Sequence, residues 1–93
     1  MEILHQQNGH KGMFYVGPAD EPQAAMTYTM PAENKLIIDH TEVSDALRGK
    51  NVGYQLVKAA VDFARIQGIK ILPLCPFAKS VFDKKSEFAD VLL

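Results

Sequence analysis

The sequence predicts an α+β fold: an antiparallel meander of about four strands, then a long helix, a fifth, parallel strand and a short C-terminal helix. Three observations lead to this prediction. Apolar residues alternate along residues 24–30, they recur at helical spacing along residues 52–64, and a short apolar segment follows that helix. A chain of 93 residues suffices for one domain, and we expect a single domain over residues 1–93.

The first half of the chain is expected to form strands. In Ala24–Met30, alanine, methionine and tyrosine side chains fall on one face and the threonines on the other, which is typical of a half-buried strand. Met13–Val16 is a short run of strand-forming residues, and Lys35–Val43 has an apolar centre. Turn-forming residues cluster at 8–12, 17–22 and 31–34. Short turns favour an antiparallel meander.

The second half follows a helical period. One helical face carries the apolar residues Val52, Leu56, Ala60, Phe63 and Ala64. Gly68 suits the left-handed residue that ends a helix, and Ile69–Leu72 predicts a short strand, which Pro73 ends because proline lacks an amide hydrogen. A strand, a helix and a strand form a crossover that makes the two strands parallel. Residues 77–85 predict a short second helix, whereas residues 88–93 are compatible with a strand or with more helix.

Composition narrows the class of protein. The net charge of −1 does not favour a nucleic-acid partner, which requires a basic surface. The single cysteine, Cys75, cannot form an internal disulfide, and neither a signal peptide nor an apolar run of about 20 residues is visible. We therefore expect a soluble cytoplasmic protein, with no membrane or nucleic-acid partner, no metal and a monomeric state.

The loop before the long helix could bind an anion. Arg48-Gly49-Lys50-Asn51 leads from a predicted strand to a predicted helix start near Val52. The first amides of a helix have no internal acceptors, and the helix dipole favours negative charge there. Arg48 and Lys50 add positive charge, and Asn51 tolerates a left-handed conformation. The alternative is that Gly49 only eases a tight turn and that the cations are solvated.

The segment Arg48–Gly53 resembles the pyrophosphate-binding motif of the GNAT acetyltransferase superfamily, Q/R-x-x-G-x-G/A. Arg48 and Gly53 match its ends, and Asn51 stands where the middle glycine is usual. The tail resembles the family's helix N-x-x-A-x-x-L-Y-x-K-x-G-F, with Cys75 at the asparagine position and Phe82 at the tyrosine position. The chain lacks the two N-terminal helices of usual members. It is similar to the small single-domain GNAT-like group of about a hundred residues, whose Pro-x-Cys-Pro stretch resembles residues 73–76.

The resemblance implies acetyl-coenzyme A as the co-substrate and an amine, on a small molecule or a peptide, as the acceptor. It implies a pantetheine arm that lies like an extra strand between Asp39–Val43 and Ile69–Leu74. The cofactor-binding residues that we carry over or infer are Thr41, Glu42, Val43, Arg48, Gly49, Lys50, Asn51, Val52, Gly53 and Lys79.

The same resemblance implies that Cys75 and His40 lie in the active site, and we predict that they are the catalytic residues. Phe82 has no hydroxyl to serve as the family's usual acid, so two titratable groups remain near the expected thioester. His40 could act as a base, and Cys75 could accept the acetyl group or only line the pocket. Glu42 is an alternative base. Strict alternation would put His40 on the buried face with Leu36 and Ile38, unless a bulge turns it.

The sequence thus predicts an acetyl-CoA-dependent N-acetyltransferase. The alternative is a module that binds CoA or acetyl-CoA with weak or no catalysis, which the missing tyrosine and the missing N-terminal helices favour. A third interpretation treats the glycine loop as a plain turn without any CoA binding.

Overall fold

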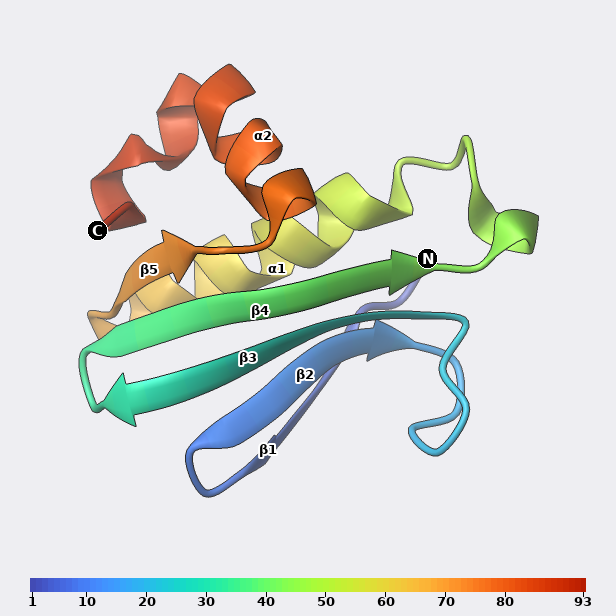
Figure 1. The fold of residues 1–93 in the computed structure, drawn as a ribbon, viewed down its shortest axis with the longest axis horizontal. Coiled ribbons are helices and arrows are strands. Elements are labelled where there is room, and N and C mark those ends of the chain that lie inside the picture. Colours follow the sequence, from blue (N-terminus) through green and yellow to red (C-terminus); the bar gives the residue numbers. More distant parts are fainter.

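The computed structural model describes residues 1–93 and confirms the predicted α+β class, with five strands in the order β1-β2-β3-β4-β5 (Figure 1). The first four pair antiparallel, and β5 adds to β4 in parallel. The strands are β1 (Leu4–Asn8), β2 (Lys11–Val16), β3 (Ala24–Ala32), β4 (Lys35–Val43) and β5 (Lys70–Pro73).

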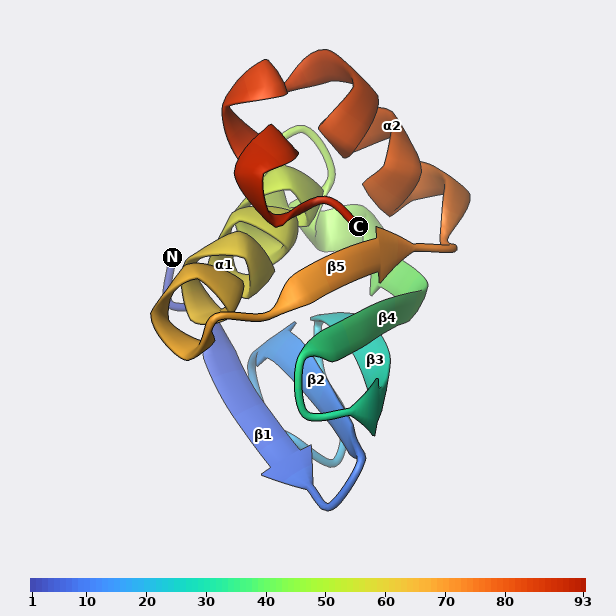
Figure 2. The ribbon, with the colours of Figure 1, turned by 90° about the vertical axis from the view of Figure 1, so that its left-hand side faces the viewer.

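Two α-helices and two 3₁₀ helices complete the chain: η1 (Asp45–Leu47), α1 (Val52–Gln67), α2 (Pro76–Lys84) and η2 (Ser86–Val91). The helix α1 lies along one face of the sheet and contacts β2, β3, β4 and β5, while α2 and the C-terminal segment lie beyond β5 (Figure 2). The left-handed Gly68 ends α1 at φ 71°, as predicted. No helix combines the length and the apolar character needed to cross a membrane.

The core lies between α1 and the sheet. Along β3 the predicted alternation holds, because Ala24, Met26, Tyr28 and Met30 are all buried. From the helix come the buried side chains of Val52, Leu56, Val57, Ala60, Val61 and Ala64. The buried Tyr28 hydroxyl shares a hydrogen bond of 2.6 Å with His5 Nε2, whose ring stacks on Phe14 with centroids 4.2 Å apart. His5 therefore satisfies a polar group at the edge of the core.

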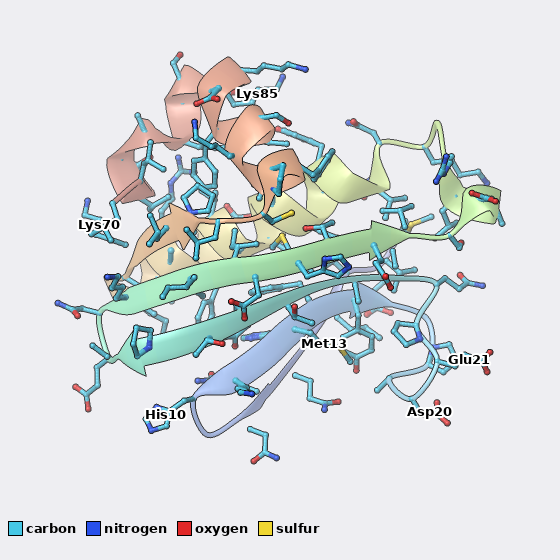
Figure 3. All side chains as sticks on the ribbon, in the orientation of Figure 1. His10, Met13, Asp20, Glu21, Lys70 and Lys85 are labelled. Atoms are coloured by element: carbon cyan, nitrogen blue, oxygen red, sulfur yellow. The ribbon has the colours of Figure 1, made fainter.

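The C-terminal segment is tied to the rest of the fold. The tail that could have been strand or helix forms η2 and then a single parallel bridge from Leu92 to Ile71 of β5. The Arg65 guanidinium of α1 contacts both carboxylate oxygens of Asp90, at 3.0 and 2.9 Å. Lys70, at the start of β5 in Figure 3, donates to the Asp90 carbonyl. These bonds hold η2 against α1 and β5.

Candidate cofactor-binding site

The loop from β4 to α1 reverses through two left-handed residues. Gly49 has φ 81°, where any side chain would be strained, and Asn51, the residue that precedes the first turn of α1, has φ 62°. Asn51 thus adopts the left-handed conformation that its side chain tolerates. Arg48 Nε lies 3.0 Å from Asp45 Oδ1, but both side chains are mostly exposed. The guanidinium is therefore weakly held and remains available to a ligand.

The N-terminus of α1 offers backbone donors with no acidic side chain in its first turn. The first intrahelical bond runs from Gln55 N to Asn51 O at 3.1 Å, so the amides of Val52, Gly53 and Tyr54 have no acceptor within the helix. The Asn51 side chain does not cap them. Unpaired amides and the positive end of the helix dipole together favour an anion at this place.

A cavity of about 340 Å³ opens at this helix end. It is lined by Thr41, Val43, Leu47, Arg48, Gly49, Asn51, Val52, Gly53, Tyr54 and Phe77. A second cavity of about 460 Å³ shares Thr41, Val43 and Arg48 with the first. It continues to Glu42 and to Ala24, the first residue of β3. The two cavities therefore form neighbouring spaces along the last residues of β4.

The last part of β4 has no strand partner on the β5 side. The parallel pairing stops at Ile38 and Pro73, and the amides of Leu74 and Cys75 both donate to the Ile38 carbonyl, at 3.1 and 3.3 Å. The chain then turns into α2, whereas β4 continues to Val43. Residues 39–43 consequently present a free strand edge beside the cavity, and an extended amide-bearing ligand could pair with such an edge.

A β-bulge in β4 decides which side chains face the cavity. The register with β3 passes from Ile38 opposite Tyr28 to His40 opposite Thr27, so Asp39 is the extra residue. After the bulge, Thr41 and Val43 line the cavity on the α1 side, while His40 and Glu42 are exposed. The bulge therefore removes His40 from the buried face that strict alternation would have given it.

His40 and Glu42 form a pair of their own, with 3.2 Å between Nε2 and Oε1. Their side chains are 66% and 79% exposed, so both are open to solvent. Asp39 does not orient His40, because its carboxylate accepts a hydrogen bond of 2.9 Å from Thr29. No hydrogen bond joins His40 to Cys75, the other predicted catalytic residue.

Cys75 is buried where β5 meets α2, and it precedes Pro76, the first residue of the helix. Its thiol donates to Thr41 Oγ1 at 3.4 Å, which ties it to the cavity wall. Burial alone would raise the pKa of the Cys75 thiol. The Thr41 hydroxyl and the backbone amides of Ala78, Phe77 and Thr41 outweigh burial, and the pKa lies below its ordinary value. These hydrogen bonds and the N-terminus of α2 therefore stabilise the thiolate relative to that of an isolated cysteine.

The structure gathers most, but not all, of the predicted cofactor-binding residues. Lys50 does not line the cavity, although it belongs to the same loop. Lys79 lies on α2, pairs with Asp83 at 3.4 Å and lines a separate cavity with Leu72 and the C-terminal leucines. Lys79 does not line the cavity at the N-terminus of α1, so the structure does not support it as a phosphate contact.

Sequence reasoning missed three side chains that line the cavity, namely Leu47, Tyr54 and Phe77. The only sequence signal for Tyr54 and Leu47 was their closeness to the loop. Phe77 comes from another element, and only the fold brings it there. No group of three or more histidine, cysteine or acidic side chains is arranged to hold a metal ion.

Comparisons with known proteins agree with this architecture. The model of the GCN5-related N-acetyl-transferase family matches residues 13–91. Among solved structures, the NMR solution structure of a GCN5-like protein from Staphylococcus aureus is 41% identical, with a TM-score of 0.76. That match covers 99% of this chain and 87% of the other. No curated protein matches.

Proposed function

Because the chain belongs to the GCN5-related N-acetyltransferase family, we propose that it is an acetyl-CoA-dependent N-acetyltransferase. One observation carries the proposal. Unpaired amides at the N-terminus of α1 lie beside Arg48, in a cavity that continues to the free edge of β4. A helix end that binds phosphate next to a strand edge that binds amides suits coenzyme A, which contains both groups. We propose that the enzyme acts in the cytoplasm as a monomer.

In this proposal the pyrophosphate binds the amides of residues 52–54, with Arg48 as a charged partner. Charge-assisted hydrogen bonds to phosphate are about twice as strong as neutral ones. Gly49 and Asn51 hold the loop open for this contact through their left-handed backbone. Support comes from the absence of any acidic side chain in the first turn that would compete for the same amides.

The pantetheine arm would extend along residues 39–43 of β4. Its two amides can pair with the backbone edge that β5 leaves free after Pro73. Thr41 and Val43 would line its path, and Glu42 would lie by the neighbouring cavity. An arm that runs from the pyrophosphate along β4 toward Asp39 would bring its thioester end near the Thr41–Cys75 contact.

Two routes to acetyl transfer are open at that end. In the direct route, the acceptor nitrogen attacks the thioester carbon, the carbon–sulfur bond breaks, and His40 or Glu42 takes the amine proton while the CoA thiolate leaves. In the covalent route, the Cys75 thiolate attacks the thioester carbon and releases CoA thiolate, which takes up a proton. The amine nitrogen then attacks the acetyl carbon of acetyl-Cys75, the carbon–sulfur bond breaks, Cys75 leaves as the thiolate, and solvent takes the amine proton. The lowered pKa of Cys75 favours the covalent route. The exposed His40–Glu42 pair favours the direct route, since an amine could reach it from solvent.

A second candidate is a CoA-binding module with weak or no catalysis. Phe82, at the position of the family's usual tyrosine, is buried and has no hydroxyl. Cys75 is only 6% exposed, which a purely structural thiol would also be. In this candidate, binding of acetyl-CoA remains but turnover is absent.

A CoA titration followed by backbone amide shifts tests the binding step. We expect shifts at residues 49–54 that exceed those of the β1–β2 turn at 8–11, which lies at the far end of the sheet. Equal shifts in both places, or none, would refute the cofactor site. Release of free CoA from acetyl-CoA in the presence of an amine panel then separates the enzyme from the binding module.

Cys75→Ala and His40→Ala separate the two routes. Lost turnover with CoA binding retained in Cys75→Ala, and one acetyl mass on Cys75 in the wild type, supports the covalent route. Retained turnover in Cys75→Ala excludes it and leaves His40 or Glu42 as the base. If both variants keep full turnover, neither residue is catalytic.

A further inference from the structure

Phe77 is an aromatic side chain of the cavity that the proposed chemistry does not use. It is the second residue of α2, and it is 42% exposed, whereas Phe82 and Phe88 are 6% and 2% exposed. Phe82 and Phe88 also pair with each other, with centroids 6.1 Å apart, while Phe77 takes part in no aromatic pair. The ring of Phe77 is therefore not fixed in the core.

The tip of this ring rests on Gly53, the second residue of α1. A Cβ added to Gly53 would lie 2.7 Å from Cε2 of Phe77 and would overlap Cζ as well. Gly53 is buried although it lies at an open helix end. The ring therefore packs against the Cα side of Gly53, beside the place where the helix presents its unpaired amides.

An anion bound to the amide of Gly53 or Tyr54 would have to lie within about 3 Å of the nitrogen. The same space is bounded by the Phe77 ring, which lines the cavity together with Arg48. A ring this close to the first turn of α1 narrows the space through which a phosphate would approach those amides. Because the ring is half-exposed and unpaired, it can rotate away from the helix end.

We propose that Phe77 is a ligand-displaced gate, which covers the N-terminus of α1 in the free protein and turns aside when the pyrophosphate of CoA binds. This inference rests on the proposed function, because it needs an anion at the same helix end.

An NMR experiment observes the gate directly. In the free protein, a nuclear Overhauser effect should link the Phe77 ring protons to the Gly53 Hα protons. Saturation with CoA should abolish that effect and shift the Phe77 ring resonances. If CoA binds and the Phe77–Gly53 effect persists, the gate is refuted while the proposed cofactor site stands. If neither the wild type nor Phe77→Ala binds CoA, both proposals fail.

A binding experiment uses inorganic pyrophosphate, which is too small to gain affinity from contact with the ring. Removal of the ring makes every molecule competent to bind, so the apparent affinity rises by the reciprocal of the fraction in which the ring is turned aside. Because the covered state is the major one in this proposal, we expect Phe77→Ala to bind pyrophosphate at least about twofold more tightly than the wild type. Leu74→Ala is the matched control, because Leu74 is an exposed apolar residue of the same turn outside the cavity lining. Unchanged or weaker binding by Phe77→Ala, or an equal gain in Leu74→Ala, contradicts the gate.

Discussion

Arg48 offers the sharpest test of the cofactor site, because its loss should weaken binding without weakening the fold. Its partner in the free protein is Asp45, and the two side chains are 75% and 91% exposed. An exposed pair of this kind contributes about 0–1 kcal/mol to stability. A charge-assisted hydrogen bond to phosphate contributes about 1.5–3 kcal/mol. Arg48→Ala should therefore weaken CoA binding by about 10- to 150-fold while the free energy of unfolding changes by about 1 kcal/mol or less.

The assay is calorimetric titration of CoA at fixed low salt, with denaturant unfolding of the same samples. Lys58→Ala is the charge-matched control, since Lys58 pairs with Asp62 on the exposed face of α1 and lies outside the cavity. Lys50→Ala should fall between the two, because Lys50 shares the loop but not the cavity lining. If Arg48→Ala and Lys58→Ala lose the same affinity, Arg48 acts only through net charge and the assigned phosphate contact is wrong.

Three further predictions follow from the same structure. Asn51→Gly should leave the free energy of unfolding and CoA binding nearly unchanged. Asn51→Val should lower the free energy of unfolding, measured with denaturant, by about 1–2 kcal/mol, because a β-branched residue is strained at φ 62°. Equal stability of the two variants would contradict this reasoning. Thr41→Val should raise the pKa of Cys75, because it removes the hydroxyl contact that lowers this pKa. The pH profile of thiol alkylation should move to higher pH in Thr41→Val and should match the wild type in Thr41→Ser. An unmoved profile in Thr41→Val would show that the hydroxyl has no effect on the thiol. Arg65 lowers the pKa of Asp90, so the stabilisation of the C-terminal segment should be present above the ordinary aspartate pKa of about 3.9 and be lost as the pH falls through the lowered value. Hydrogen exchange of the last amides should show this loss in the wild type and no such step in Asp90→Asn.

The sequence predicted those features that depend on neighbouring residues. The alternation along β3, the apolar face of α1 and the left-handed Asn51 each follow from a local preference, and all are present. The strand β1 was harder to delimit, because its centre, Gln6–Gln7, is polar and little of it is buried. Its place follows from pairing with β2 rather than from its own composition.

The features of the site that stayed hidden depend on contacts between distant segments. The bulge at Asp39 is defined by the register between β3 and β4, which a single strand does not encode. The Thr41–Cys75 contact spans 34 residues, and the contact of Phe77 with Gly53 joins two helices. These are the contacts that would decide which residues meet a ligand, so the composition of the site was more predictable than its geometry.

The extra residue in β4 has a consequence for how this chain can change. Before Asp39 the even-numbered side chains of β4 face α1, and after it the odd-numbered ones do. The two parts of the strand therefore alternate out of phase with each other. A strand that kept Asp39 but lost the bulge would turn the imidazole of His40 inward and carry Thr41 away from the sulfur of Cys75, although neither residue had been altered. Deletion of Asp39 would instead remove the extra step and leave His40 outward and Thr41 inward, as they are now. The sides on which His40 and Thr41 lie are therefore set by the pairing of β4 with β3 and not by the identity of the residue that supplies the extra step.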